Sequence, residues 1–169
     1  NLDMSPTVIF ETARQKGIQV IGICDHNSTR QARLMGEMEA EVRVLPGVEL
    51  TSKEEIHCLA FFDDLKALDG MQELIDWHLP KVKNKPEIFG DQVVVDEKGK
   101  ILYVEENLLH MAIDLNLDEL IHRVREFNGL VIPAHANKPV NSILSQLGWL
   151  PPMLDVDALE IIGAGDVLL

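Results

Sequence analysis

The chain has 169 residues, the size of one ordinary domain with a single core. Hydrophobic residues make up 46% of it and charged residues 25%, as is normal for a globular protein. The net charge of -13 argues against a broad basic surface that grips nucleic acid nonspecifically, and no apolar stretch approaches the roughly 20 residues that span a bilayer.

The first half of the chain alternates predicted helices and strands. Ser5 suits a helix N-cap, Pro6 suits the first helical position, and Gly17 suits the position after the last turn. Pro46 and Gly47 predict a turn between two apolar runs. We therefore expect helices over 7–16, 29–40 and 65–78, and strands over 18–24, 42–45 and 56–62.

The second half begins with a loop over 80–90 that contains three lysines. Two short apolar runs then flank the sequence Asp96-Glu97-Lys98-Gly99, which predicts a β-hairpin inserted near 84–104. Beyond it we expect helices over 105–113, 116–128 and 140–149, and strands over 129–134 and 158–162. Strands that alternate with helices indicate one α/β domain over 1–169, with a mostly parallel sheet or barrel.

Ionisable residues stand beside the apolar runs. They fill a core poorly, whereas active sites of α/β folds collect at the C-terminal ends of strands. Asp25 and His26 come directly after the strand over 18–24. The other residues at the ends of apolar runs are Glu49, His57 and His135. We therefore expect three imidazoles and one carboxylate to converge on one site.

Imidazole nitrogens and carboxylate oxygens are the ligands that zinc and similar divalent metals prefer. A glutamate can bridge two ions through its two oxygens. Such ions favour phosphoester hydrolysis because they activate a water and neutralise phosphoryl oxygens, so no nucleophilic side chain is needed. The net acidity does not exclude a phosphorylated substrate, because bound cations reverse the field inside a pocket.

Each of these residues also has a plainer interpretation. One histidine beside an apolar run is more often structural, but the repeated placement favours ligands. Asp25 either caps the next helix or orients a neighbouring metal ligand without binding the metal itself. Asn27 and Ser28 are turn or substrate-binding residues, and Lys138 is a phosphate contact or a solvated lysine. We assign the remaining histidines, His78, His110 and His122, to surface or packing.

The two cysteines, Cys24 and Cys58, lie in apolar runs and predict thiols in a reducing cytoplasm rather than a disulfide framework. A buried thiol is usually inert, which weakens a cysteine-hydrolase hypothesis. The Gly-x-Ser-x-Gly pattern of serine hydrolases is absent, and so is a glycine-rich phosphate loop.

Five motifs together resemble the polymerase and histidinol phosphatase (PHP) superfamily, and among its members the stand-alone bacterial proteins. In this sequence they are Met4-Ser5-Pro6, Ile21 to Ser28, Leu45 to Thr51, Glu55-Ile56-His57 and Ile132 to His135. The resemblance implies a distorted seven-stranded (β/α) barrel with two or three zinc, manganese or iron ions. It also implies a metal-dependent phosphoesterase that acts on a nucleotide, a nucleic acid end or a small phosphorylated metabolite. Carried over by position, the metal ligands would be His26, Glu49, His57 and His135, with Glu49 as the bridge.

The superfamily also places a His-x-His on its first strand and an Asp-x-His after its last strands, and neither is in this sequence. A further ligand, often aspartate, should precede Ser5, where Asn1 and Asp3 stand. We therefore expect an incomplete barrel that lacks both terminal segments. Two alternatives remain open: a noncatalytic metal-binding module with a structural or partner role, and a metal-dependent amidohydrolase.

Overall fold

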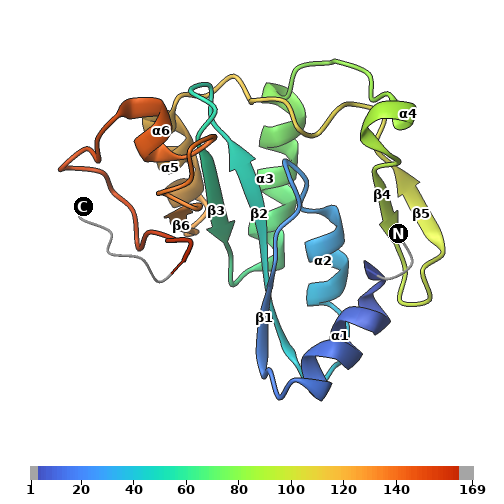
Figure 1. Cartoon of the computed structure of the whole chain (residues 1–169). Helices are drawn as coiled ribbons and strands as arrows, with labels where there is room; N and C mark the ends of the chain where they lie inside the picture. Colours follow the sequence, from blue (N-terminus) through green and yellow to red (C-terminus); the bar gives the residue numbers. More distant parts are fainter. Residues whose placement is uncertain (1–3, 164–169) are drawn as a thin grey trace.

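The computed structural model describes residues 4–163, in which a four-stranded sheet is flanked by helices and a separate hairpin lies to one side (Figure 1). The sheet has the order β1-β2-β3-β6. Its strands are β1 (Val20–Ile23), β2 (Arg43–Thr51), β3 (His57–Phe61) and β6 (Leu130–Pro133). The helices are α1 (Pro6–Gln15), α2 (Arg30–Gly36), α3 (Leu65–His78), α4 (Pro86–Phe89), α5 (Leu117–Glu126) and α6 (Ile143–Leu147).

The direction of β3 corrects the prediction of a mostly parallel core. β1 and β2 pair in parallel, but β3 is antiparallel to both of its neighbours, β2 and β6. Only residues 52–56 connect β2 to β3, and a parallel connection needs a crossover of a dozen or more residues. Within residues 4–163 the sheet is open, with β1 and β6 at its edges, and the predicted barrel is not closed.

The predicted turn at Pro46 and Gly47 is also wrong, because β2 runs straight through both residues. Pro46 still accepts a hydrogen bond from the Phe62 amide at 3.0 Å. Gly47 lies so close to β3 that a Cβ there would stand 2.4 Å from the Ala60 carbonyl oxygen. The glycine therefore permits close strand contact rather than a change of direction.

The core lies between the sheet and the helices α3 and α5. Leu68, Met71 and Ile75 of α3 recur at helical spacing and are fully buried, and the helix predicted over 65–78 is confirmed. α5 begins with a capping box between Asn116 and Glu119, which accounts for its sharp start. Among the described helices, none has both the length and the hydrophobicity needed to cross a membrane.

The predicted helix over 105–113 does not form; this segment is a coil with an isolated bridge at Asn107 and a turn at 109–110. Its backbone groups bond to side chains from elsewhere in the fold. Gln92 donates to the Asn107 carbonyl at 2.7 Å and accepts from the Leu109 amide at 3.0 Å, and Asn27 also bonds to the segment. Because side chains satisfy these groups, the helical pattern of hydrogen bonds is not needed.

Three other predicted elements are shorter or less regular than expected. The helix over 29–40 ends at Gly36, and the helix over 140–149 covers only α6. Residues 158–162 do not form a regular strand. Residues 157–160 nevertheless run beside β6 in the same direction. The Asp157 amide donates to the Val131 carbonyl at 2.9 Å, and the Glu160 amide donates to the Pro133 carbonyl at 3.1 Å.

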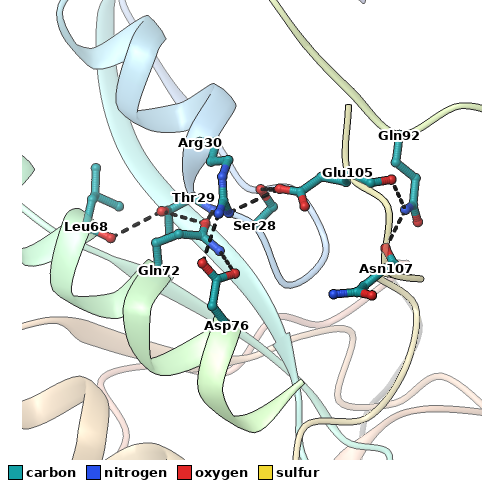
Figure 2. A network of polar contacts seen from close by, with 9 residues as sticks. All are labelled: Ser28, Thr29, Arg30, Leu68, Gln72, Asp76, Gln92, Glu105 and Asn107. Carbon is teal, nitrogen blue, oxygen red and sulfur yellow. Dashed lines mark hydrogen bonds and ion pairs between the residues drawn. The ribbon is translucent and has the colours of Figure 1, made fainter. Parts of the chain in front are cut away.

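The predicted hairpin is confirmed as β4 (Val93–Val95) and β5 (Ile101–Val104). It is fastened to α2 by side chains that Figure 2 shows in part: the Arg30 guanidinium contacts the Glu105 carboxylate at 3.1 Å. Arg30 also lies over the Tyr103 ring, 5.0 Å from its centre. The Gln31 side chain donates to and accepts from the Val95 backbone, at 3.1 and 2.9 Å. These contacts hold the hairpin beside the loop that follows β1.

Candidate metal centre

One carboxylate, that of Glu49, lies among three histidine side chains. His57 Nδ1 is 2.9 Å from Glu49 Oε1, and His135 Nε2 is 3.5 Å from the same oxygen. His26 Nε2 lies 3.7 Å from the other oxygen, Oε2. The structure therefore brings together all four residues that the sequence proposed as ligands.

Backbone pairing places His26 beside Glu49. The loop after β1 continues to follow β2, because the Glu49 amide donates to the Asp25 carbonyl at 3.0 Å and the Asn27 amide donates to the Glu49 carbonyl at 2.9 Å. Asn27 has a left-handed backbone, with φ of 45°. Asparagine tolerates this conformation better than most residues do, so the chain turns here with little strain.

The antiparallel direction of β3 brings His57 into the centre. His57 opens its strand, and in a wholly parallel sheet the first residue of a strand would lie at the edge opposite the C-terminal ends. Because β3 runs backwards, His57 pairs with Thr51 at the end of β2 and its carbonyl accepts from the Ala134 amide at 2.9 Å. His135 follows at the end of β6, with a left-handed φ of 36°.

The donor set fits divalent metal ions. Two ligands on one tetrahedral ion, each at 2.0–2.2 Å, lie about 3.4 Å apart, close to the separations around Glu49. One ligand atom each from His26, Glu49 and His57 lies within 4.8 Å of the others. His135 falls outside that tight group, but it approaches Glu49 Oε1, and its ring centre lies 5.1 Å from that of His57. Oε1 of Glu49 therefore faces two histidines, and Oε2 faces the third.

The charges in the centre influence one another. Burial opposes the charge on Glu49, but the hydrogen bond from His57 and the nearby histidines outweigh it, so the pKa of Glu49 lies below its ordinary value. Burial lowers the pKa of His26, against the opposing effect of Glu49. His26 Nδ1 and His135 Nδ1 are buried and have no hydrogen-bond partner in the described part of the chain. The centre therefore combines a carboxylate that favours its charged form with imidazole nitrogens that have no partner in this part of the chain, and such groups ligate metals.

Sequence reasoning missed three residues around the centre. The Asn141 side-chain amide lies 3.1 Å from His57 Nε2 and so helps to fix the orientation of the ring. Glu160 accepts from the His135 amide at 2.7 Å. The His110 ring lies 4.8 Å from the His26 ring, although we had assigned it to surface or packing within a helix. All three residues reach the centre through contacts between distant segments, so no local sequence pattern predicts them.

Asn27 is not placed to contact a substrate, contrary to the prediction. It is fully buried and its side-chain amide bonds only to the backbone: it donates to the carbonyls of Leu109 and Met111 at 2.7 and 2.8 Å, and accepts from the Thr51 amide at 3.3 Å. Asn27 therefore ties the loop after β1 to the coil that carries His110.

Asp25 and Lys138 stand in looser positions. Asp25 was expected to orient its neighbour, but His26 Nε2 faces Glu49 and its Nδ1 is unpartnered, so no such bond is formed. The crowded mouth of the sheet raises the pKa of Asp25 through desolvation, although the residue still reaches solvent. Lys138 is exposed, and its backbone amide bonds to the His135 carbonyl at 2.8 Å.

The two cysteines are protonated thiols. Burial, with a contribution from Glu49, raises the pKa of Cys24 and of Cys58 to about 12. A thiol in this state is a poor nucleophile, which agrees with the sequence-based argument against a cysteine hydrolase.

A hollow of about 270 Å³ opens beside the centre. Asp25, His26 and His110 line one side of it, and the hairpin with Glu105 lines the other. Ser28 and Arg30 hold Glu105 in that wall (Figure 2). The arrangement offers a metal-binding cluster next to a space of small-molecule size.

Comparison with solved structures shows what the fold resembles. The lesion-specific endonuclease Q of Pyrococcus furiosus aligns with 94% of this chain, with a TM-score of 0.66 and 18% identity. A protein of Bifidobacterium adolescentis, provisionally described as a metal-dependent phosphoesterase, aligns with 92% of it, with a TM-score of 0.58 and 20% identity. Endonuclease Q in complex with a 27-mer duplex carrying an abasic lesion aligns with a TM-score of 0.52 and 18% identity.

The chain spans 37% of the length of the endonuclease Q chains and 71% of the phosphoesterase chain. Scans against protein-family models and against curated proteins found no match. The identities of 18–20% with these solved structures show that the chain shares their fold.

Proposed function

We propose that this chain carries the metal centre of a metal-dependent phosphoesterase, a hydrolase of phosphate mono- or diesters. The observation that supports the proposal most is the contact of one carboxylate with three imidazoles, at 2.9, 3.5 and 3.7 Å. The fold neighbours agree with it, since one is described as a phosphoesterase and another as an endonuclease that acts on DNA lesions.

The roles of the residues follow from their positions. Glu49 would bridge two divalent ions, with His57 and His135 on the side of Oε1 and His26 on the side of Oε2. Bound ions of this kind supply positive charge for the phosphoryl oxygens and an activated water. Zinc, manganese and iron all suit this mixture of nitrogen and oxygen donors.

The surrounding residues would position these ligands and the substrate. Asn141 holds the ring of His57, and Glu160 holds the backbone of His135 in its left-handed conformation. Asp25 and His110 border the hollow beside the centre, where the rest of the substrate would lie. Lys138 follows His135 closely and would reach a phosphate oxygen from the rim. Two classes of substrate suit such a site: small phosphorylated compounds and nucleic acid ends.

Metal binding and activity should be measured together on the full chain, two site variants and one control variant. Glu49→Gln keeps the size of the side chain but removes the bridging charge, so we expect affinity for zinc or manganese and phosphoesterase activity to fall by more than about 100-fold. Asn141→Ala should cost less, about 10- to 100-fold in metal affinity, as is typical of groups that orient a ligand. Glu126→Gln, an exposed change on α5, should behave as the unchanged chain does.

The assays should use a chelator competition for metal affinity, and bis(p-nitrophenyl) phosphate, mononucleotides and short oligonucleotides for activity. A folded chain that binds metal but hydrolyses none of these esters would favour the noncatalytic module instead. Equal metal affinity in the Glu49→Gln variant would show that the four residues are not the metal site.

A further inference from the structure

Trp77 lies in the last turn of α3 and is 83% exposed. An indole that large is normally buried, because it offers a great deal of apolar surface. With His78 and Leu79 it forms one side of a hollow of about 590 Å³, and the coil over 112–114 forms the other. Figure 1 shows this end of α3 at the same edge of the molecule as the C-terminal end of β2.

The lining of this hollow has two lysines and one carboxylate, in a chain whose net charge is -13. Lys53 pairs with Asp114 at 2.7 Å, but the two side chains are 67% and 72% exposed. Such surface pairs contribute little and can be displaced by a stronger anion. Within residues 4–163, the Lys81 ammonium bonds to a backbone carbonyl of α3, that of Asp76, and forms no ion pair. The next residues of the loop add Lys83, paired with Glu106.

The hollow is close to the candidate metal centre. Ile113, in its floor, donates to the Thr51 carbonyl at 2.9 Å, and Thr51 is the strand partner of His57. Two successive backbone pairings of this kind span about 10 Å. That distance corresponds to about two or three nucleotides of a strand, at roughly 3.4 Å for each.

We infer that the Trp77 hollow is a subsite for single-stranded nucleic acid, in which a base stacks on the indole and neighbouring phosphates contact Lys53 and Lys81. An exposed aromatic face combined with nearby cations is the arrangement that binds single strands without sequence preference. The inference rests on the proposed function, since the strand would carry its phosphoester from this hollow to the centre around Glu49. A free nucleotide shares the chemistry of one stacked base but would not use both lysines.

The two tryptophans of the chain permit a direct binding test. In a Trp149→Phe variant Trp77 is the single indole, so its fluorescence reports on the hollow alone. With metals removed by EDTA, we expect a short oligothymidylate to quench this fluorescence saturably. Binding of a dye-labelled strand should weaken by about 5- to 150-fold in Trp77→Ala, the range expected for one stacked base, and much less in Trp77→Phe. Trp149→Phe should bind as the unchanged chain does.

Charge and strand length supply the second arm. Two lysine–phosphate contacts predict about a fivefold loss of affinity when salt rises from about 50 to 150 mM, and Lys53→Gln with Lys81→Gln should flatten that dependence. Unchanged affinity in folded Trp77→Ala would overturn the inference, and so would equal binding of a mononucleotide and an oligonucleotide. Because EDTA removes any metal, failure of strand binding is independent of the esterase assay, and an inactive chain that still binds strands would refute only the proposed function.

Discussion

The buried amide of Asn27 offers the sharpest test of how the site is held together. Replacing it with alanine removes the two donors to the Leu109 and Met111 carbonyls and the acceptor for the Thr51 amide. The loop after β1 then loses its side-chain hydrogen bonds to β2 and to the coil over 105–113. We therefore expect a large loss of stability from a residue that was predicted only as a turn or substrate contact.

The expected magnitude follows from the three groups left behind. A buried polar group without a partner costs about 1–3 kcal/mol. The two carbonyls belong to half-buried residues that regain some water, so about 1 kcal/mol each is appropriate, with about 1–2 for the buried Thr51 amide. Alanine also tolerates the left-handed φ of 45° poorly, which adds about 1 kcal/mol. The sum is about 4 kcal/mol, a large part of the roughly 5–15 kcal/mol that stabilises a domain.

Urea unfolding in EDTA would measure this change without interference from bound metal. Asn128 provides a matched control, because it has a similar left-handed φ of 55° but is exposed. Asn128→Ala should lose only the backbone contribution of about 1 kcal/mol. If Asn27→Ala were no less stable than Asn128→Ala, the hydrogen bonds of Asn27 would not be what fastens the coil, and the reasoning would fail.

Three further predictions concern the sheet. Gly47→Ala should destabilise by about 3 kcal/mol, because its Cβ would stand 2.4 Å from the Ala60 carbonyl, and urea unfolding measures this. The pKa of Asp157 lies below its ordinary 3.8, because the Val131 amide donor and a nearby arginine outweigh burial. Asp157→Asn should therefore lower the free energy of unfolding by about 1 kcal/mol at neutral pH. The difference in stability between the two proteins should vanish as pH falls through the lowered pKa. Cys58, whose burial raises its pKa from 9.0 to about 12, should react with maleimide at about pH 8 roughly 1,000-fold more slowly in the folded than in the unfolded chain.

The two substitutions have controls in the same chain. Gly17→Ala meets open space at a φ of 69° and should cost only about 1 kcal/mol. Asp155→Asn changes a more exposed partner of the same arginine, and should lose less than Asp157→Asn. A stable Gly47→Ala variant, a pH-independent Asp157→Asn difference or rapid labelling of native Cys58 would each contradict the structure.

Local patterns in the sequence were sufficient for many parts of the fold. α3 covers the predicted range, and the hairpin of β4 and β5 flanks the predicted turn. These elements depend on helical spacing and turn residues, which act within a few residues of one another. The proposed ligands could also be found, because ionisable residues beside apolar runs indicate a functional site.

Local patterns failed where distant groups decide the conformation. The coil over 105–113 has a helical pattern, but side chains of Asn27 and Gln92 satisfy part of its backbone in a non-helical conformation. The same coil carries His110 to His26, a contact that no spacing in the sequence predicts. β2 continues through Pro46 and Gly47, where a local pattern predicts a turn. Gly47 is needed there because the neighbouring strands approach so closely that no larger residue fits.

The sequence by itself determined which residues could hold a metal, because each stands in or beside an apolar run. Only the tertiary structure decided that these ends meet. In the predicted parallel sheet, His57 would lie at the far edge from Glu49, and the short connection over 52–56 reverses β3 and places the two side chains 2.9 Å apart. Strand identity follows from local side-chain pattern, but strand direction depends on the pairing of segments distant in sequence, so the site became one only in the folded sheet.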